Sequence, residues 1–224
     1  MWSLCPVLSP SFLPHIRVLL LKGCGFSSKT MKCLTDSMGR GDLLNLEVLD
    51  LEKNRGGDEF LDVIGGVLRK DAVPQLKDLR LRGNTVSRFP TRKMMKFFQA
   101  LRSAECPFCL HVSVDLDLSC MPEEIVRGVG AGMYPSLCSL TLVLIEGQLV
   151  SFLDSLIQAA EEPKFEVLDL FLRSPPSAGF SLLGEAIQGG RMKSLRRVRC
   201  SQSAGNYDDP TEAKITFFTA LTQV

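Results

Sequence analysis

Leucine and similar apolar residues recur along the chain with one spacing: two of them lie three positions apart, and a third follows two positions later. Three copies are closed by cysteine or asparagine: Ile16-x-x-Leu19-x-Leu21-x-x-Cys24, Leu46-x-x-Leu49-x-Leu51-x-x-Asn54 and Leu76-x-x-Leu79-x-Leu81-x-x-Asn84. Shorter copies begin at Leu137, Phe165 and Leu195. The alternation inside each copy predicts a short strand with one buried side. The starts lie 30, 30, 61, 28 and 30 residues apart, so one structural unit repeats about every 30 residues.

The interval of 61 residues leaves room for one further copy. Within residues 110–118 the even positions are apolar and the odd positions are mostly polar, which predicts a half-buried strand. Its pairing can slide by two residues but not by one, because a shift by one would exchange its two faces. Seven repeats result, with starts near residues 16, 46, 76, 109, 137, 165 and 195.

Helical patterns separate the strands. We predict helices over 59–70 with Asp58 as N-cap, over 92–103 after Thr91, from 123 after Pro122, over 148–161, over 181–188, and over 211–222 after Asp209 and Pro210. Each unit is therefore strand, bend, helix and return, and such crossovers connect parallel strands. One unit cannot bury both its strand and its helix, so neighbouring units must stack.

The motif resembles that of the leucine-rich repeat family, L-x-x-L-x-L-x-x-N/C, and the period is similar to that of the ribonuclease-inhibitor-like subgroup. The resemblance covers about residues 13–224 and implies an α/β solenoid, a horseshoe with a parallel β-sheet on the concave side and α-helices on the convex side. Asparagine in this family satisfies buried backbone groups at the bend. Ile145, Arg173 and Ser203 replace it in the last three repeats.

We expect residues 1–13 to form a lead or partial cap, and residues 14–224 to form the repeat domain. Arrays of this kind carry capping repeats with a polar outer face. None is visible after the last predicted helix, so we expect the chain to be a segment of a longer array or an incompletely predicted gene product. Appending the next natural repeat should then raise the melting temperature.

The resemblance places the residues beside the inner leucines on the concave face, in three columns. The first column is Val18, Val48, Asp78, His111, Ser139, Val167 and Arg197; the second is Leu20, Asp50, Arg80, Ser113, Thr141, Asp169 and Arg199; the third is Lys22, Glu52, Arg82, Asp115, Val143, Phe171 and Ser201. The candidate partner-binding residues are Asp50, Glu52, Arg80, Arg82, His111, Asp115, Asp169, Phe171, Arg197 and Arg199.

Two interpretations of this face stay open. In the first, the charges form cross-strand pairs that each add a few tenths of a kcal/mol, roughly, to stability. In the second, alternating acidic and basic blocks form a partner surface of complementary charge with Phe171 as an apolar anchor, because aromatic and arginine residues dominate binding hot spots.

Composition and charge exclude several classes of protein. The 224 residues include 26 Lys+Arg and 25 Asp+Glu, which gives a formal net charge of +1. Nucleic-acid binders and polybasic membrane binders need a basic excess, and a content of 7% aromatic residues is low for base stacking. The start lacks a basic region and is interrupted by Pro6, Pro10 and Pro14, which is not typical of a secretory signal. We expect a monomer in the cytoplasm or nucleus, with no nucleic-acid or membrane partner.

Eight cysteines are spread irregularly, and we expect Cys24, Cys33, Cys138 and Cys200 to be reduced core residues. Cys106-x-x-Cys109-x-His111 with Cys120 has the spacing of half a tetrahedral zinc site, but the second pair is missing. We therefore predict no metal.

His111, Ser113 and Asp115 have the residue types of a hydrolase triad. Their i, i+2 spacing sets them ~6.6 Å apart along a strand, beyond direct hydrogen-bond reach. The Gly65-Gly66 and Gly189-Gly190 pairs and Gly128-x-Gly130-x-Gly132 fall within or at the end of helical patterns, so they are not phosphate loops. We predict no enzyme activity and no cofactor.

The expected function is a non-catalytic protein–protein interaction scaffold that binds a partner on the concave face. The family resemblance implies partners as varied as nucleases, small GTPases, and innate-immune or ubiquitin-ligase assemblies. A nuclease inhibitor is disfavoured because a strongly acidic surface is missing. The alternative is a structural or sensor segment of a longer leucine-rich repeat protein, such as a GTPase activator or ubiquitin-ligase adaptor, with the ligand site outside this chain.

Overall fold

The computed structural model describes residues 15–54, 57–69, 72–84, 92–103, 110–118, 121–172 and 179–202. The expected lead over 1–13, the expected helix over 211–222, and Cys106, Cys109, Cys120, Arg173 and Ser203 lie outside these ranges. The chain divides into two compact units, Met1–Asp115 and Leu116–Val224.

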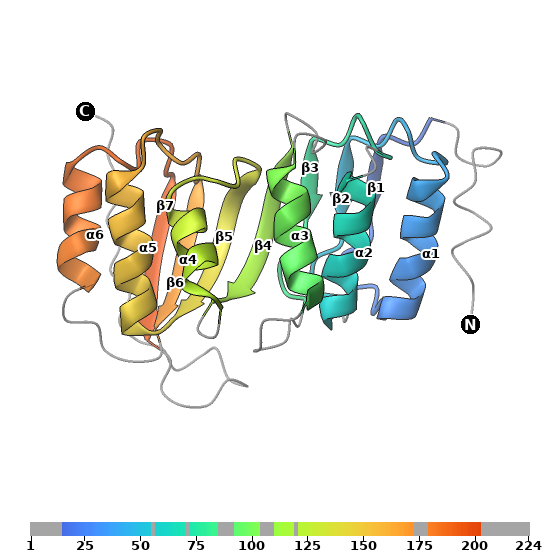
Figure 1. Ribbon diagram of the computed structural model, residues 1–224. Helices are drawn as coiled ribbons and strands as arrows, with labels where there is room; N and C mark the ends of the chain where they lie inside the picture. Colours follow the sequence, from blue (N-terminus) through green and yellow to red (C-terminus); the bar gives the residue numbers. More distant parts are fainter. Residues whose placement is uncertain are drawn as a thin grey trace. The chain divides into compact units, whose positions relative to one another are not determined.

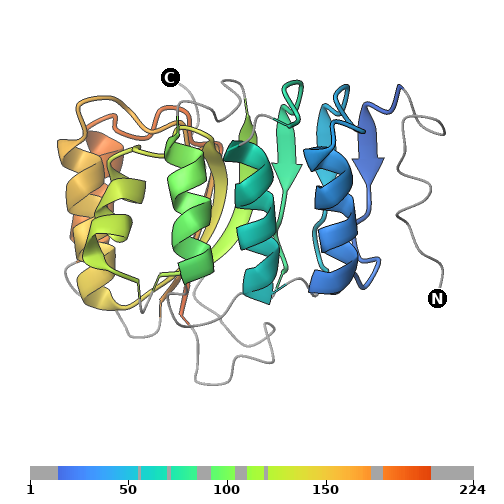
Figure 2. The ribbon, with the colours of Figure 1, turned by 45° about the vertical axis from the view of Figure 1, so that its right-hand side comes forward.

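Strands and helices alternate in the first unit. The strands are β1 (Val18–Leu20), β2 (Val48–Asp50), β3 (Asp78–Arg80) and the start of β4 (His111–Asp117), and each pairs in parallel with the next. The helices are α1 (Ser28–Gly39), α2 (Gly57–Arg69) and α3 (Arg92–Arg102). These three helices stand in a row on one side of the strands (Figure 1, Figure 2).

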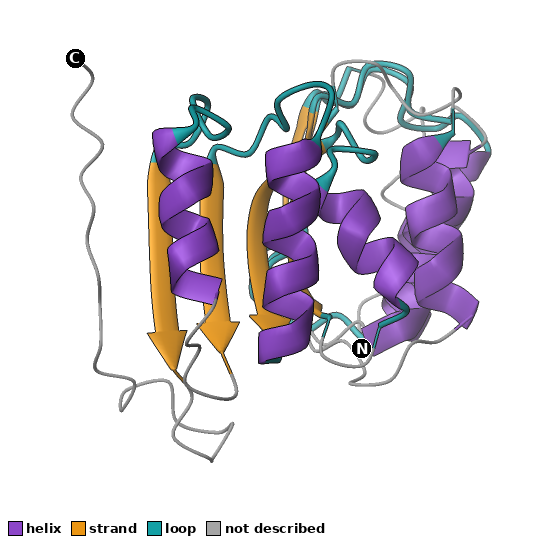
Figure 3. Ribbon diagram, turned by 60° about the vertical axis from the view of Figure 1, so that its left-hand side comes forward, coloured by secondary structure: helices purple, strands orange, loops and turns teal. Residues whose placement is uncertain are grey.

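The second unit has the same alternation. Its elements are α4 (Glu123–Gly130), β5 (Leu137–Leu144), α5 (Glu146–Gln158), β6 (Val167–Leu172), α6 (Gly179–Gln188) and β7 (Arg197–Gln202). Strands β5, β6 and β7 pair in parallel in sequence order. The helices again lie to one side of the strands (Figure 3). The predicted α/β class and the repeated strand–helix units are confirmed.

The core of each unit lies between its strands and its helices. Leucines of the repeat motif are almost fully buried, among them Leu49, Leu79, Leu140 and Leu168, each 0% exposed. Because alternate strand residues point to opposite faces, the residues that flank these leucines lie on the face away from the helices. The strand pattern therefore separates one packed face from one face that carries polar groups.

Asparagine side chains end the first strands. Asn54 Nδ2 donates to the carbonyl oxygens of Leu21 and Leu51, both at 2.9 Å, and Asn84 Nδ2 donates to those of Leu51 and Leu81 at 2.9 and 2.7 Å. This bears out the role expected for asparagine at the bend. The backbone turns just before each asparagine, where Lys53 and Gly83 have φ values of 54° and 72°.

The bend is different in the fifth repeat, where Ile145 replaces asparagine. Strand β5 runs for 8 residues, whereas β1, β2 and β3 have 3 each. Ile145 occupies the asparagine position, is exposed, and is followed directly by α5. In this repeat the ladder therefore continues to Leu144, and the helix follows without a separate turn.

Several predicted bounds were wrong. Helix α1 was not predicted at all, and α2 begins at Gly57, so Asp58 lies inside its first turn and is not its N-cap. Helix α5 covers Glu146–Gln158 where 148–161 was predicted, because the strand passes into the helix at Ile145. Helix α6 begins two residues before the predicted start.

The cysteines differ in state. Cys138 and Cys200 are reduced thiols and are buried, as predicted. Cys24 is free but exposed, because it lies at the bend after β1 and not in the core. Cys33 is disulfide-bonded, so the expected reduced thiol is wrong there. In the described part of the chain, no helix is long and apolar enough to cross a membrane.

Candidate functional site: the strand faces

We call the face opposite the helices the strand face of each unit. In the first unit its residues are Val18, Leu20, Lys22, Val48, Asp50, Glu52, Asp78, Arg80, Arg82, His111, Ser113 and Asp115. In β5, β6 and β7 of the second unit they are Ser139, Thr141, Val143, Val167, Asp169, Phe171, Arg197, Arg199 and Ser201. The strand register pairs neighbouring strands as the three predicted columns require.

The register of β4 shows which residues of the fourth repeat, the least regular one, lie on the strand face. His111 pairs with Asp78 and Ser113 pairs with Arg80. This is the pairing in which His111 starts the first column, so the fourth repeat has the predicted faces. The predicted site residues of the first unit are thus brought onto one surface.

Ion pairs between neighbouring strands cover the third column of the first unit. Lys22 Nζ lies 2.6 Å from Glu52 Oε2, and Arg82 Nε lies 3.2 Å from Asp115 Oδ1. The hydrogen bond to Glu52 raises the pKa of Lys22 above its usual range. Asp115 also accepts a hydrogen bond from the Gly83 backbone N–H at 2.6 Å. The charged side chains of this column are therefore paired with one another.

Arg80 lies between two carboxylates. Its Nη2 is 2.6 Å from Asp78 Oδ2 in the same strand, and its Nη1 is 3.6 Å from Asp50 Oδ2 in the neighbouring strand. The hydrogen bond to Asp78 raises the pKa of Arg80. Asp50 is only 6% exposed and accepts a hydrogen bond from the Glu52 N–H. Asp50 therefore holds Arg80 in place and offers little surface to a partner.

Apolar residues occupy one end of this face. Val18 is 53% exposed and Leu20 is 62% exposed, and both lie in β1. Sequence reasoning placed them in the columns but did not select them as binding residues, because it weighted charge and aromatic character. Their exposure could not be predicted from a column position alone.

The triad-like residues do not act on one another. Asp115 is held by Arg82 and Gly83, while His111 is exposed at the start of β4. No group of three or more potential metal ligands occurs among the described residues.

The strand face of the second unit has a different composition. Arg197 donates to Asp169 Oδ2 at 2.9 Å, and Asp169 is 3% exposed. Arg199 pairs in register with Asp169, is exposed, and forms no ion pair with any described residue. Phe171 lies between Val143 and Ser201 in the register and is half-buried.

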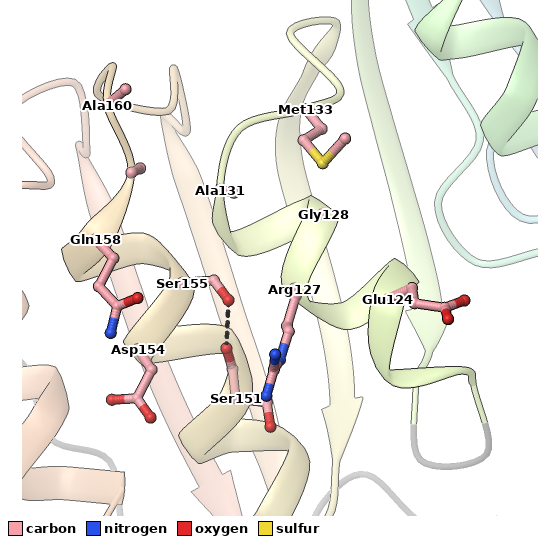
Figure 4. A pocket seen from close by; sticks show the side chains of 11 residues that line it. Glu124, Arg127, Gly128, Ala131, Met133, Ser151, Asp154, Ser155, Gln158 and Ala160 are labelled. Carbon is pink, nitrogen blue, oxygen red and sulfur yellow. Dashed lines mark hydrogen bonds between the residues drawn. The ribbon is translucent and has the colours of Figure 1, made fainter.

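A groove between α4 and α5 was not predicted. It has a volume of about 550 Å³, and its lining includes Arg127, Met133, Asp154 and Ala160 (Figure 4). Ser155 Oγ, in α5, donates to the Ser151 backbone oxygen at 2.8 Å, so this hydroxyl is used within the helix. The groove lies on the helix side of the second unit, away from the predicted site residues.

Comparison with models of known protein families gives no match, and no curated protein matches the chain. The repeats and the two strand faces are therefore the features of the chain that point to a function.

Proposed function

We propose that this chain is a leucine-rich repeat protein of the ribonuclease-inhibitor-like subgroup. The regular spacing of the strands, the parallel register and the asparagine bends support this assignment. The proposal includes the horseshoe architecture, with the strand faces on its concave side. Solenoids of this type use extended concave surfaces for binding.

We propose further that the chain is a non-catalytic scaffold that binds a protein partner on its strand faces. The observation that supports this most is the exposure of Val18 and Leu20 on a face whose charges are otherwise paired. Apolar side chains grouped on an exposed surface are typical of protein interaction sites. Phe171 supplies a second apolar position in the other unit.

A second candidate function is a structural or sensor segment of a longer protein, with its ligand site elsewhere. The pairing of Lys22 with Glu52 and of Arg82 with Asp115 favours it, because charges that neutralise each other attract a partner less. The two functions differ in whether changes on the strand faces alter the set of bound proteins.

The test is purification of partners from the native cell with single variants. Leu20→Asp and Phe171→Ala change the strand faces, and Leu44→Asp is the matched control, because Leu44 is 52% exposed but belongs to neither strand face. We expect the first two variants to lose a partner that the control retains. Recovery of the same partners by all three variants would support the second candidate. Charge reversal at Arg80 is less informative, since it also removes the counter-ion of Asp78.

A further inference from the structure

We infer that the strand face of the second unit binds an extended acidic peptide segment in which an acidic residue and an apolar residue lie two positions apart. This inference rests on the proposed function and names the chemistry of the partner. It follows from the charges of the two strand faces, from the position of Phe171, and from the spacing between neighbouring strands.

The two strand faces differ in their charge. In the first unit, Lys22, Arg80 and Arg82 face four carboxylates, Asp50, Glu52, Asp78 and Asp115, and each of the three cations has a carboxylate within 4 Å, at 2.6, 2.6 and 3.2 Å. Each positive charge named on this face is therefore already paired with a carboxylate. A cation that could bind an acidic partner must be sought on the strand face of the second unit.

The strand face formed by β5, β6 and β7 has a positive excess. Asp169 is the single acidic residue that these three strands place on it, and it is paired with Arg197 at 2.9 Å. That pair neutralises one arginine and fixes its guanidinium. Arg199 is left exposed with no ion pair to any described residue. Guanidinium groups bind carboxylates through two parallel hydrogen bonds, so Arg199 suits an Asp or Glu side chain of a partner.

Apolar side chains lie within reach of this arginine. Phe171 pairs with Ser201, two residues beyond Arg199, and Val143 lies on the other side of Phe171. Diagonal neighbours of this kind are about 7–8 Å apart in a sheet. In an extended peptide, residues i and i+2 are ~6.6 Å apart on one side. A carboxylate on Arg199 and an apolar side chain on Phe171 therefore fit positions i and i+2 of one extended segment.

The experiment uses fluorescein-labelled peptides as probes and fluorescence anisotropy as the readout. The first peptide has Ser at every even position, and Glu and Leu take turns at the odd positions. The second peptide has Lys in place of each Glu. We expect the Glu peptide to bind the whole chain, with a Kd that rises as salt is added. Arg199→Glu should raise that Kd at least tenfold, and Arg199→Lys should retain part of the affinity.

Arg196→Glu is the matched control, because Arg196 is exposed, immediately precedes β7 and is not a residue of the strand face. An equal rise in Kd for this variant would overturn the inference, since general charge would then explain binding. Equal affinity for the Lys peptide, or stronger binding of a single-stranded RNA oligonucleotide, would overturn it as well. If Leu20→Asp and Phe171→Ala lose a cellular partner while neither peptide binds, this inference fails and the proposed function stands.

Discussion

Replacement of Asn54 should show how much of the fold depends on its bends. Its side chain is 2% exposed. Its amide nitrogen donates to the carbonyl oxygens of Leu21 and Leu51, and its Oδ1 accepts from the Phe26 N–H at 3.0 Å. One side chain thus satisfies backbone groups from three places in the chain.

The cost of Asn54→Ala follows from the groups left behind. The Leu51 carbonyl keeps a donor, because Asn84 Nδ2 also lies 2.9 Å from it. The Leu21 carbonyl and the Phe26 N–H lose the bond that Asn54 provides. Each buried polar group that loses its partner costs about 1–3 kcal/mol, so the two groups together should lower the free energy of unfolding by about 2–6 kcal/mol.

Asn84→Ala is the internal comparison. Among the described residues, Asn84 Oδ1 has no hydrogen-bond partner, and the Leu51 carbonyl would keep Asn54 as its donor. Only the Leu81 carbonyl loses a bond, so Asn84→Ala should cost about 1–3 kcal/mol, less than Asn54→Ala. Urea unfolding followed by far-ultraviolet circular dichroism gives both values.

Asn54→Asp keeps the size of the side chain but removes the amide donor, so it separates the effect of the hydrogen bonds from the effect of side-chain volume. A carboxylate cannot donate, and it would face two carbonyl oxygens, so folding should favour its protonated form and raise its pKa. A raised pKa in the folded state means that stability is present below the unfolded pKa and lost as the pH rises through the folded one. The deficit relative to the original protein should therefore shrink at acid pH. Equal costs for both alanine variants, or a pH-independent deficit for Asn54→Asp, would refute the reasoning.

Three further predictions concern glycine, strain and a thiol. A Cβ at Gly130 would lie 2.3 Å from the Phe152 carbonyl oxygen, so Gly130→Ala should lower the free energy of unfolding by about 1–3 kcal/mol. Gly184 in α6 has open space around it, so Gly184→Ala should raise the free energy of unfolding by about 0.5–1 kcal/mol. Thermal melts of both variants check the two signs. Lys53 has a φ of 54°, so Lys53→Gly should stabilise by about 1 kcal/mol in urea unfolding, and a loss would contradict this. Burial raises the pKa of the Cys200 thiol from 9.0 to about 11. The free energy of unfolding should therefore keep its full value below pH 9 and decrease between pH 9 and about pH 11, as the thiol loses its proton. A Cys200→Ala variant should lack this decrease, and identical pH profiles for the two proteins would count against the prediction.

Periodicity predicted the strand register because a strand cannot slip by one residue without exposing its leucines. The pairing of His111 with Asp78 was predictable in this way. Helix α1 was not, because polar residues interrupt its apolar stripe. Thr35 and Ser37 are buried there, and the Thr35 hydroxyl is satisfied by donating to the Met31 and Lys32 carbonyls, at 3.2 and 2.9 Å.

The candidate site was predictable in position but not in its contacts. The columns showed that acidic and basic residues would be neighbours. They could not show that Arg80 takes its closest partner, Asp78, from its own strand, or that Asp169 is buried beneath Arg197. Those choices depend on side-chain rotamers and on local packing, which a spacing rule does not contain.

The shared carbonyl of Leu51 has a consequence for how such a chain can change in length. It accepts hydrogen bonds from Asn54 in its own repeat and from Asn84 in the next. A gene duplication or deletion of one whole period keeps every asparagine opposite a carbonyl of the preceding repeat. A change by part of a period leaves an amide without an acceptor at the junction. We therefore expect tolerated insertions and deletions in the first unit to come in steps of about 30 residues, or to fall in segments away from the bends.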